Sequence, residues 1–187
     1  MKRFLLAALA AGILLAPMPR AQAQYGDEAP AKLSFKVGLY TPSGADFGGK
    51  LEDYWRSLGL EYALDLDELD RPTTSVGAFL TNGDNDLVRA SMVGVQYEKR
   101  WYGNQENVSS PYVAAGLGYN FLSSKARDFI WEPWVSRKGS NPGITVAAGY
   151  QFKDSFYGEL RYYYSGELDN GVDFSGIGLS AGVRLQF

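Results

Sequence analysis

The segment GIGLSAGVRLQF, residues 176–187, alternates between two kinds of side chain. Its odd positions carry apolar side chains, and its even positions carry glycine, serine, arginine and glutamine. Neighbouring side chains of a β-strand point to opposite faces of the sheet, whereas a helix would mix these two sets. The segment therefore predicts a strand with one apolar face and one face of small and polar side chains.

The same alternation recurs seven more times upstream. It covers residues 33–40, 57–66, 74–81, 93–98, 112–121, 144–152 and 156–164. The short turn Lys153-Asp154-Ser155 joins the last two into a predicted hairpin. Strands of about 9 to 11 residues have the length that a tilted strand needs to cross a membrane. The sequence thus predicts an all-β protein with eight strands.

The N-terminus has the pattern of a secretory signal peptide. Lys2 and Arg3 precede an apolar run over residues 4–16, and the small residues Ala21 and Ala23 follow. This order of basic, apolar and small residues is typical of a cleaved export signal. The alternative is an uncleaved anchor, but about 20 apolar residues are usually needed to cross a bilayer. We expect residues 1–23 to be removed and residues 24–187 to form one domain.

Composition excludes several classes of function. The chain has no cysteine and no histidine, so we expect neither disulfides nor the usual Ser-His-Asp, Cys-His or zinc sites. The signal peptide carries three bases and no acid, so its removal takes the formal net charge from −3 to −6. An acidic chain without clustered bases is a poor nucleic-acid binder. We therefore predict no enzyme, no cofactor and no nucleic-acid partner.

The face opposite the large apolar residues collects both glycines and charges. We expect this face to line a narrow lumen, in which the charges pair with one another, because buried charges are tolerated only when they are paired. The predicted lumen charge network comprises Lys36, Glu61, Asp65, Glu98, Glu159, Arg161 and Arg184. The alternative is a soluble barrel or sandwich, with these charges on a solvated face.

The export signal, the eight alternating strands and the ending Gly-Val-Arg-Leu-Gln-Phe resemble small outer-membrane barrels of the OmpA, OmpX and OmpW group. The resemblance implies an eight-stranded antiparallel up-and-down transmembrane β-barrel in the bacterial outer membrane, surrounded by its lipids. It also implies escort by periplasmic chaperones and insertion by the barrel assembly machinery, which would read the terminal strand with Phe187. Aromatic residues near strand ends on the apolar face agree with this, since membrane barrels carry such girdles.

The family topology would place both termini in the periplasm and turn four connections outward. These are residues 41–56, 82–86, 122–143 and 165–172. The third contains the candidate surface-loop contacts Phe129, Trp131, Trp134 and Arg137, since exposed aromatics beside bases can contact phosphates or a partner. The alternative is a loop folded on the rim or inserted in lipid. In the second connection, residues 82–86, side chains with oxygen atoms at alternate positions also allow a weak metal site. We interpret this segment as a hairpin turn.

Three functions fit these features. The first is a structural or surface-interaction protein with a lumen largely filled by side chains. The second is a narrow, porin-like channel for small or apolar solutes, and the third is a lipid-modifying barrel enzyme. We favour the first because an eight-stranded barrel is just wide enough for side chains to fill it.

Overall fold

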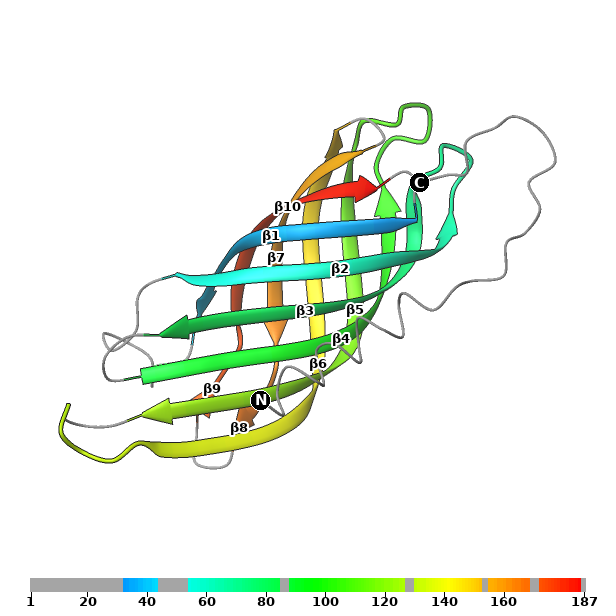
Figure 1. The fold of residues 1–187 in the computed structure, drawn as a ribbon. Helices are drawn as coiled ribbons and strands as arrows, with labels where there is room; N and C mark the ends of the chain where they lie inside the picture. Colours follow the sequence, from blue (N-terminus) through cyan, green and yellow to red (C-terminus); the bar gives the residue numbers. More distant parts are fainter. Residues whose placement is uncertain are drawn as a thin grey trace.

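A computed structural model of the protein describes residues 32–43, 54–84, 88–126, 130–152, 155–168 and 172–185 (Figure 1). Eight strands close into a barrel in the order β1-β10-β7-β6-β5-β4-β3-β2, and each strand is antiparallel to both neighbours. They are β1 (Leu33–Pro42), β2 (Trp55–Leu66), β3 (Pro72–Asp84), β4 (Val88–Tyr102), β5 (Ser110–Ala126), β6 (Val135–Phe152), β7 (Phe156–Tyr164) and β10 (Gly176–Leu185). The predicted eight-stranded, all-β antiparallel barrel is confirmed.

Two very short strands complete the described structure. β8 (Glu167–Leu168) and β9 (Val172–Asp173) pair with each other in the connection between β7 and β10. The described residues contain no helix that is long and apolar enough to span a membrane. The predicted signal peptide lies outside the described residues.

The register between the first and last barrel strands closes the barrel. β1 pairs along its whole length with β10, from Leu33 opposite Leu185 to Pro42 opposite Gly176. We call the end where β1 begins and β10 ends the terminal end, and the opposite end the loop end. The turns of residues 67–71 and 103–109 lie at the terminal end, because each joins strands that meet there.

Most large apolar side chains of the barrel strands point away from the barrel axis. Val37 is 47 % exposed, Leu117 is 67 % exposed and Leu179 is 62 % exposed, whereas charged residues such as Glu61 and Arg161 are buried. A soluble barrel or sandwich has the reverse arrangement, with its apolar face inside and its polar face in water. The wall of this barrel is therefore suited to an apolar surrounding.

The strands β4, β5 and β6 are longer than the alternation of apolar residues indicates. Most of the predicted connection 122–143 is strand, because β5 and β6 stay paired up to Ala126 and Val135. Residues 135–143 of β6 pair with β5 but not with β7, so this hairpin projects at the loop end (Figure 1). Polar residues occupy both of its faces there, such as Ser123 on the outer face and Ser124 on the inner face, and an apolar pattern therefore could not reveal these strand ends.

Inward-facing glycines make room for large rings. A Cβ atom at Gly149 would lie 2.6 Å from the Tyr112 hydroxyl, and a Cβ atom at Gly182 would overlap the Tyr157 ring. Tyr112 and Tyr157 are both buried inside the barrel. These glycines are thus needed where two tyrosines cross a narrow interior.

Candidate functional site

Six charged side chains form a closed ring of ion pairs inside the barrel. Lys36 of β1 is the first member: its Nζ atom lies 2.7 Å from Glu61 Oε2 and 3.1 Å from Glu159 Oε1. Glu61 comes from β2 and Glu159 from β7, so one lysine links three strands. Its side chain is 12 % exposed, and those of the two glutamates are buried.

The other half of the ring is made by two arginines and Glu98. Arg100 Nη2 lies 2.6 Å from Glu61 Oε2, and Arg100 Nε lies 2.9 Å from Glu98 Oε1. Arg161 pairs with the second Glu98 oxygen, and its Nη2 atom lies 3.0 Å from Glu159 Oε1. The order Lys36-Glu61-Arg100-Glu98-Arg161-Glu159 therefore returns to Lys36. Bases and acids alternate around the ring, so its formal charges cancel.

The ring spans the lumen and does not merely follow the wall. Arg161 belongs to β7 and Glu98 to β4, and these strands are separated by β5 and β6 on one side of the barrel. Tyr112 of β5 adds a hydrogen bond from its hydroxyl to Glu159 Oε2 at 2.9 Å. Buried charges cost little only when they are paired and hydrogen-bonded. Each charged group of the ring has an opposite charge within ion-pair distance, contributed from four strands. Two ring atoms, Glu61 Oε1 and Arg100 Nη1, are buried without a hydrogen-bond partner among the described residues.

Strand periodicity explains how the ring is assembled. Glu98 and Arg100 are two residues apart on β4, and Glu159 and Arg161 are two apart on β7, so each couple points to the same side of its strand. Arg100 was absent from the predicted network. The alternation that places Glu98 inside also reaches Arg100, so the signal was present in the sequence.

Two of the predicted network residues lie outside this ring. The prediction for Asp65 is wrong: irregular pairing between β2 and β3 flanks it, and its side chain is exposed and accepts a hydrogen bond from Thr73 Oγ1 at 3.1 Å. A bulge adds a residue to one strand and so shifts the alternation of faces. Arg184 is buried, but it donates to Gln151 Oε1 and, at 3.3 Å, to the Asp70 carbonyl.

A second layer fills the barrel at the loop end, and this layer is apolar. Its buried members are Tyr40, Trp55, Phe79, Val88, Ala90, Met92, Leu122 and Phe174, with Tyr163 packed against them. Phe174, from the connection between β9 and β10, is fully buried, and its carbonyl accepts a hydrogen bond from Tyr40. The ring centroids of Trp55 and Phe174 are 5.9 Å apart. The alternation in the sequence does not reveal this layer, because Trp55 and Phe174 lie outside the predicted strands.

An arginine joins the two turns at the terminal end. The Nη2 atom of Arg71 lies 2.7 Å from Asp67 Oδ2, and its Nη1 atom donates to the carbonyls of Asn104 and Asn107 at 2.7 and 2.8 Å. The guanidinium also lies 4.2 Å from the ring centroid of Tyr102. The connection between β4 and β5, residues 103–109, is thus held by the neighbouring turn of residues 67–71.

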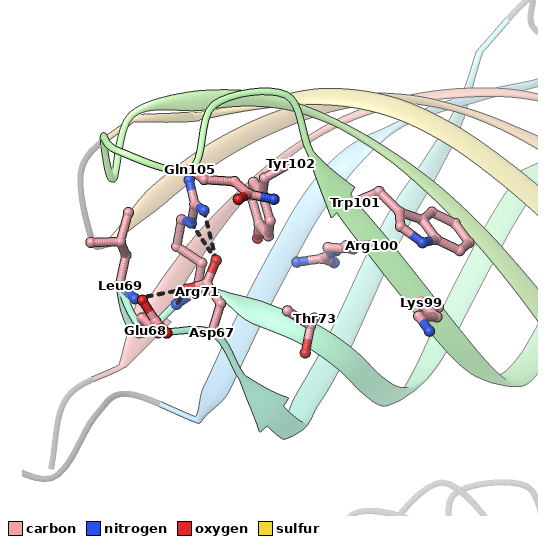
Figure 2. Close-up of a pocket in the computed structure, with 10 residues that line it drawn as sticks. All are labelled: Asp67, Glu68, Leu69, Arg71, Thr73, Lys99, Arg100, Trp101, Tyr102 and Gln105. Atoms are coloured by element: carbon pink, nitrogen blue, oxygen red, sulfur yellow. Dashed lines mark hydrogen bonds and ion pairs between the residues drawn. The ribbon is translucent and has the colours of Figure 1, made fainter.

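The contacts of Arg71 at the terminal end also determine the pKa of Asp67. Burial raises the pKa of the Asp67 carboxyl, but hydrogen bonds from the Arg71 side chain and from the backbone amides of Arg71 and Leu69 outweigh burial. The net result is a pKa below the ordinary aspartate value. A pocket of about 470 Å³ lies beside this pair, between the turn of residues 67–71 and the end of β4. Figure 2 shows the residues that line it. Lys99 and Trp101 line its far side.

The structure describes three of the four candidate surface-loop contacts. Trp131 is 82 % exposed between β5 and β6, and Trp134 lies against Arg89, whose Cζ atom is 5.0 Å from the centroid of its ring. Arg137 is exposed and lies on β6 opposite Ser124 of β5. Phe129 lies outside the described residues, as does Phe187, the predicted assembly signal.

The described residues offer no metal centre. The predicted turn at residues 82–86 is partly strand, since β3 continues to Asp84, while residues 85–87 lie outside the described part. Within that part, no group of three or more acidic side chains is placed to hold a metal ion.

Three solved structures with this architecture are small outer-membrane barrels. The N-terminal β-barrel domain of Pseudomonas aeruginosa OprF is 14% identical, with 83% of this chain and 98% of that chain covered and a TM-score of 0.55. Neisserial surface protein A is 14% identical, with 87% and 100% covered and a TM-score of 0.53. Ail, the attachment invasion locus protein of Yersinia pestis, is 18% identical, with 84% and 100% covered and a TM-score of 0.51.

No protein-family model and no curated protein sequence matches the chain. At these identities the structural likeness shows the fold alone. The chain has the eight-stranded barrel fold of the OmpA, OmpX and OmpW type that the sequence resembles.

Proposed function

We propose that this protein is an integral β-barrel of the bacterial outer membrane with a structural or surface-interaction role. We also propose that its lumen is closed to solutes. The observation that carries the proposal is an apolar outer wall combined with an inner ring in which every charged group has an opposite partner. A soluble protein gains nothing from this inverted arrangement, whereas a lipid-embedded barrel requires it.

The two interior layers support a closed lumen. The ion-pair ring spans the barrel near its middle, and the aromatic layer with Trp55 and Phe174 lies between the ring and the loop end. A solute would have to break paired buried charges and then displace packed rings. Eight-stranded barrels in general have interiors that side chains can fill. A narrow channel is therefore the less favoured alternative.

The orientation and assembly of the barrel are part of the same proposal. Residues 1–23 would direct export, and the terminal end, with its short turns, would face the periplasm, as short turns do in this class of barrel. Periplasmic chaperones and the barrel assembly machinery would deliver the chain, with Phe187 as part of the recognised final strand. The membrane lipids would contact the exposed apolar wall.

Surface interaction would belong to the loop end. The β5–β6 hairpin projects there and carries the exposed Trp131 at its tip. An exposed aromatic side chain on a projecting hairpin is suited to contact with a partner. The names of two structural neighbours, a surface protein and an attachment invasion locus protein, are compatible with such a role. We propose no enzymatic activity, since histidine and cysteine are absent.

The membrane proposal is tested by extracting the mature protein into detergent and running it on a gel with and without boiling, alongside far-ultraviolet circular dichroism. We expect a strand-rich spectrum and a band whose mobility changes on boiling, because the folded barrel resists the detergent at room temperature. A protein that is soluble without detergent and shows one mobility would contradict the proposal.

A further inference from the structure

The outer wall of β2 to β5 changes from apolar to polar between two adjacent rows of register partners. The last apolar row contains Leu58, Leu80, Val93 and Phe121, and the β6 residue opposite Phe121 is already polar, Ser140. The next row toward the loop end contains Arg56, Asn82, Ser91, Ser123 and Lys138. The row after that contains Asp84, Arg89, Lys125 and Ser136. In a membrane, these two polar rows would lie at the level of the lipid headgroups.

The two polar rows are basic, although the chain as a whole is acidic. They contain four bases and a single acid, Asp84, against a formal net charge of −3 for the whole sequence. Arg89 and Lys138 are exposed, and Lys125 is half-buried. Among the described residues, no ion pair joins any of these three bases to an acid. We call Arg89, Lys125 and Lys138 the basic patch.

The basic patch places two like charges on neighbouring strands. Arg89 and Lys125 are direct register partners, and like charges placed directly opposite each other destabilise a sheet. Arg89 is also the register partner of Asp84 on β3, whereas the partners of Lys125 are Arg89 and Ser136, neither of them acidic. Trp134 stacks against the Arg89 guanidinium, with 5.0 Å between Cζ and the ring centroid, and so helps to hold it in place. Lys138 lies on the next strand, opposite Ser123, one row closer to the apolar wall.

We infer that the basic patch binds phosphate groups of lipid headgroups in the leaflet at the loop end. Phosphate oxygens accept charge-assisted hydrogen bonds from guanidinium and ammonium groups, and an anion between Arg89 and Lys125 would offset their repulsion. Hydroxyl groups of Ser123 and Ser136 on the same wall provide further donors. The exposed aromatic side chains Tyr119 and Phe121 lie in the apolar rows just below, where acyl chains would begin. This inference rests on the proposed membrane location.

The test measures how much lipid the purified mature protein retains in non-ionic detergent, by native mass spectrometry. The probe is a glucosamine-disaccharide lipid carrying two phosphates, and the comparison probe is the same lipid after dephosphorylation. The variant combines Arg89→Gln, Lys125→Gln and Lys138→Gln. Lys99→Gln is the matched control, because Lys99 is an exposed base on the outward face of β4 at the terminal end.

We expect the natural protein to retain the phosphorylated lipid and the triple variant to retain about tenfold less of it. The Lys99→Gln protein should behave like the natural one, and the dephosphorylated lipid should bind weakly to all three. Equal retention by the triple variant, or equal retention of both lipids, would overturn the inference. Preference for a soluble sulfated polysaccharide over the lipid, lost in the triple variant, would also overturn it in favour of a polyanion site.

The same gel-mobility measurement separates this inference from the proposed function. If the triple variant keeps a heat-modifiable band and still retains the phosphorylated lipid, then only the basic patch is wrong. If the natural protein needs no detergent, then the membrane proposal itself fails, and the inference that rests on it fails with it.

Discussion

At the residue scale, the charge ring makes stability depend on the balance of buried charges. Arg161→Met leaves Glu98 and Glu159 buried with one partner fewer each. Removing one partner from a buried ion pair costs about 3 to 5 kcal/mol, because it leaves an uncompensated charge. We expect a loss of that order in the free energy of unfolding, measured by urea titration in lipid vesicles.

Two further variants make this prediction specific. Combining Arg161→Met with Glu98→Gln restores the charge balance, so the double variant should be more stable than the single one. Asp65→Asn changes an acid that the structure places outside the lumen, and surface changes usually stay within about 0.5 kcal/mol. A large loss for Asp65→Asn, or none for Arg161→Met, would contradict the structure of the ring.

A second residue-scale prediction concerns pH and the rim pair of Asp67 with Arg71. The pKa of Asp67 is lower in the folded protein, so its contribution to stability is present above the ordinary aspartate pKa, about 3.9. That contribution is lost as the pH falls through the lowered folded-state value. Asp67→Asn should therefore lower the urea midpoint at neutral pH but make little difference in strong acid. A difference that is independent of pH would show that charge is not the cause.

The residues also show what the sequence could and could not reveal. Period-two alternation placed Lys36, Glu61 and Glu159 on the inner face, and the structure brings them into contact. The same alternation places Arg100 on the inner face once the predicted strand of residues 93–98 is extended to the observed end of β4 at Tyr102. Asp65 could not be placed in this way, because a single irregularity in strand pairing reverses the face of the following residue.

At the scale of elements, the sequence pattern predicted the number of barrel strands but not the residues at which several of them end. Apolar side chains mark a strand only where it meets an apolar surrounding. The loop-end parts of β5 and β6 carry polar side chains on both faces, so residues 122–143 were predicted as a connection. The interior aromatic layer was missed for a related reason, since Phe174 comes from a connection and not from a barrel strand.

The packing between elements gives a prediction about inward-facing glycine. Gly149→Ala adds a Cβ atom that would lie 2.6 Å from the Tyr112 hydroxyl and 2.7 Å from the Gly158 carbonyl oxygen. Overpacking of this kind typically costs about 1 to 3 kcal/mol. Gly158→Ala is the matched control on β7, because its Cβ atom would meet nothing closer than 3.8 Å. Urea unfolding should show a loss for the first variant and little change for the second.

At the scale of the whole molecule, the barrel is an apolar cylinder around two different interior layers. The charge ring joins β1, β2, β4 and β7, and the aromatic layer occupies the barrel toward the loop end. Each layer is assembled from residues far apart in the sequence. A deletion within either layer should therefore affect the barrel as a unit and not one hairpin alone.

The closed lumen is tested most directly by conductance in planar lipid bilayers. The sample is the mature protein refolded into lipid, and its heat-modifiable gel band verifies that the barrel is intact. A porin reconstituted in the same bilayers serves as the positive control. We predict that the protein produces no current steps above the bilayer baseline at any applied voltage that the porin tolerates. Reproducible steps of defined size from the folded protein would show that the lumen conducts, and a channel would then be the better account.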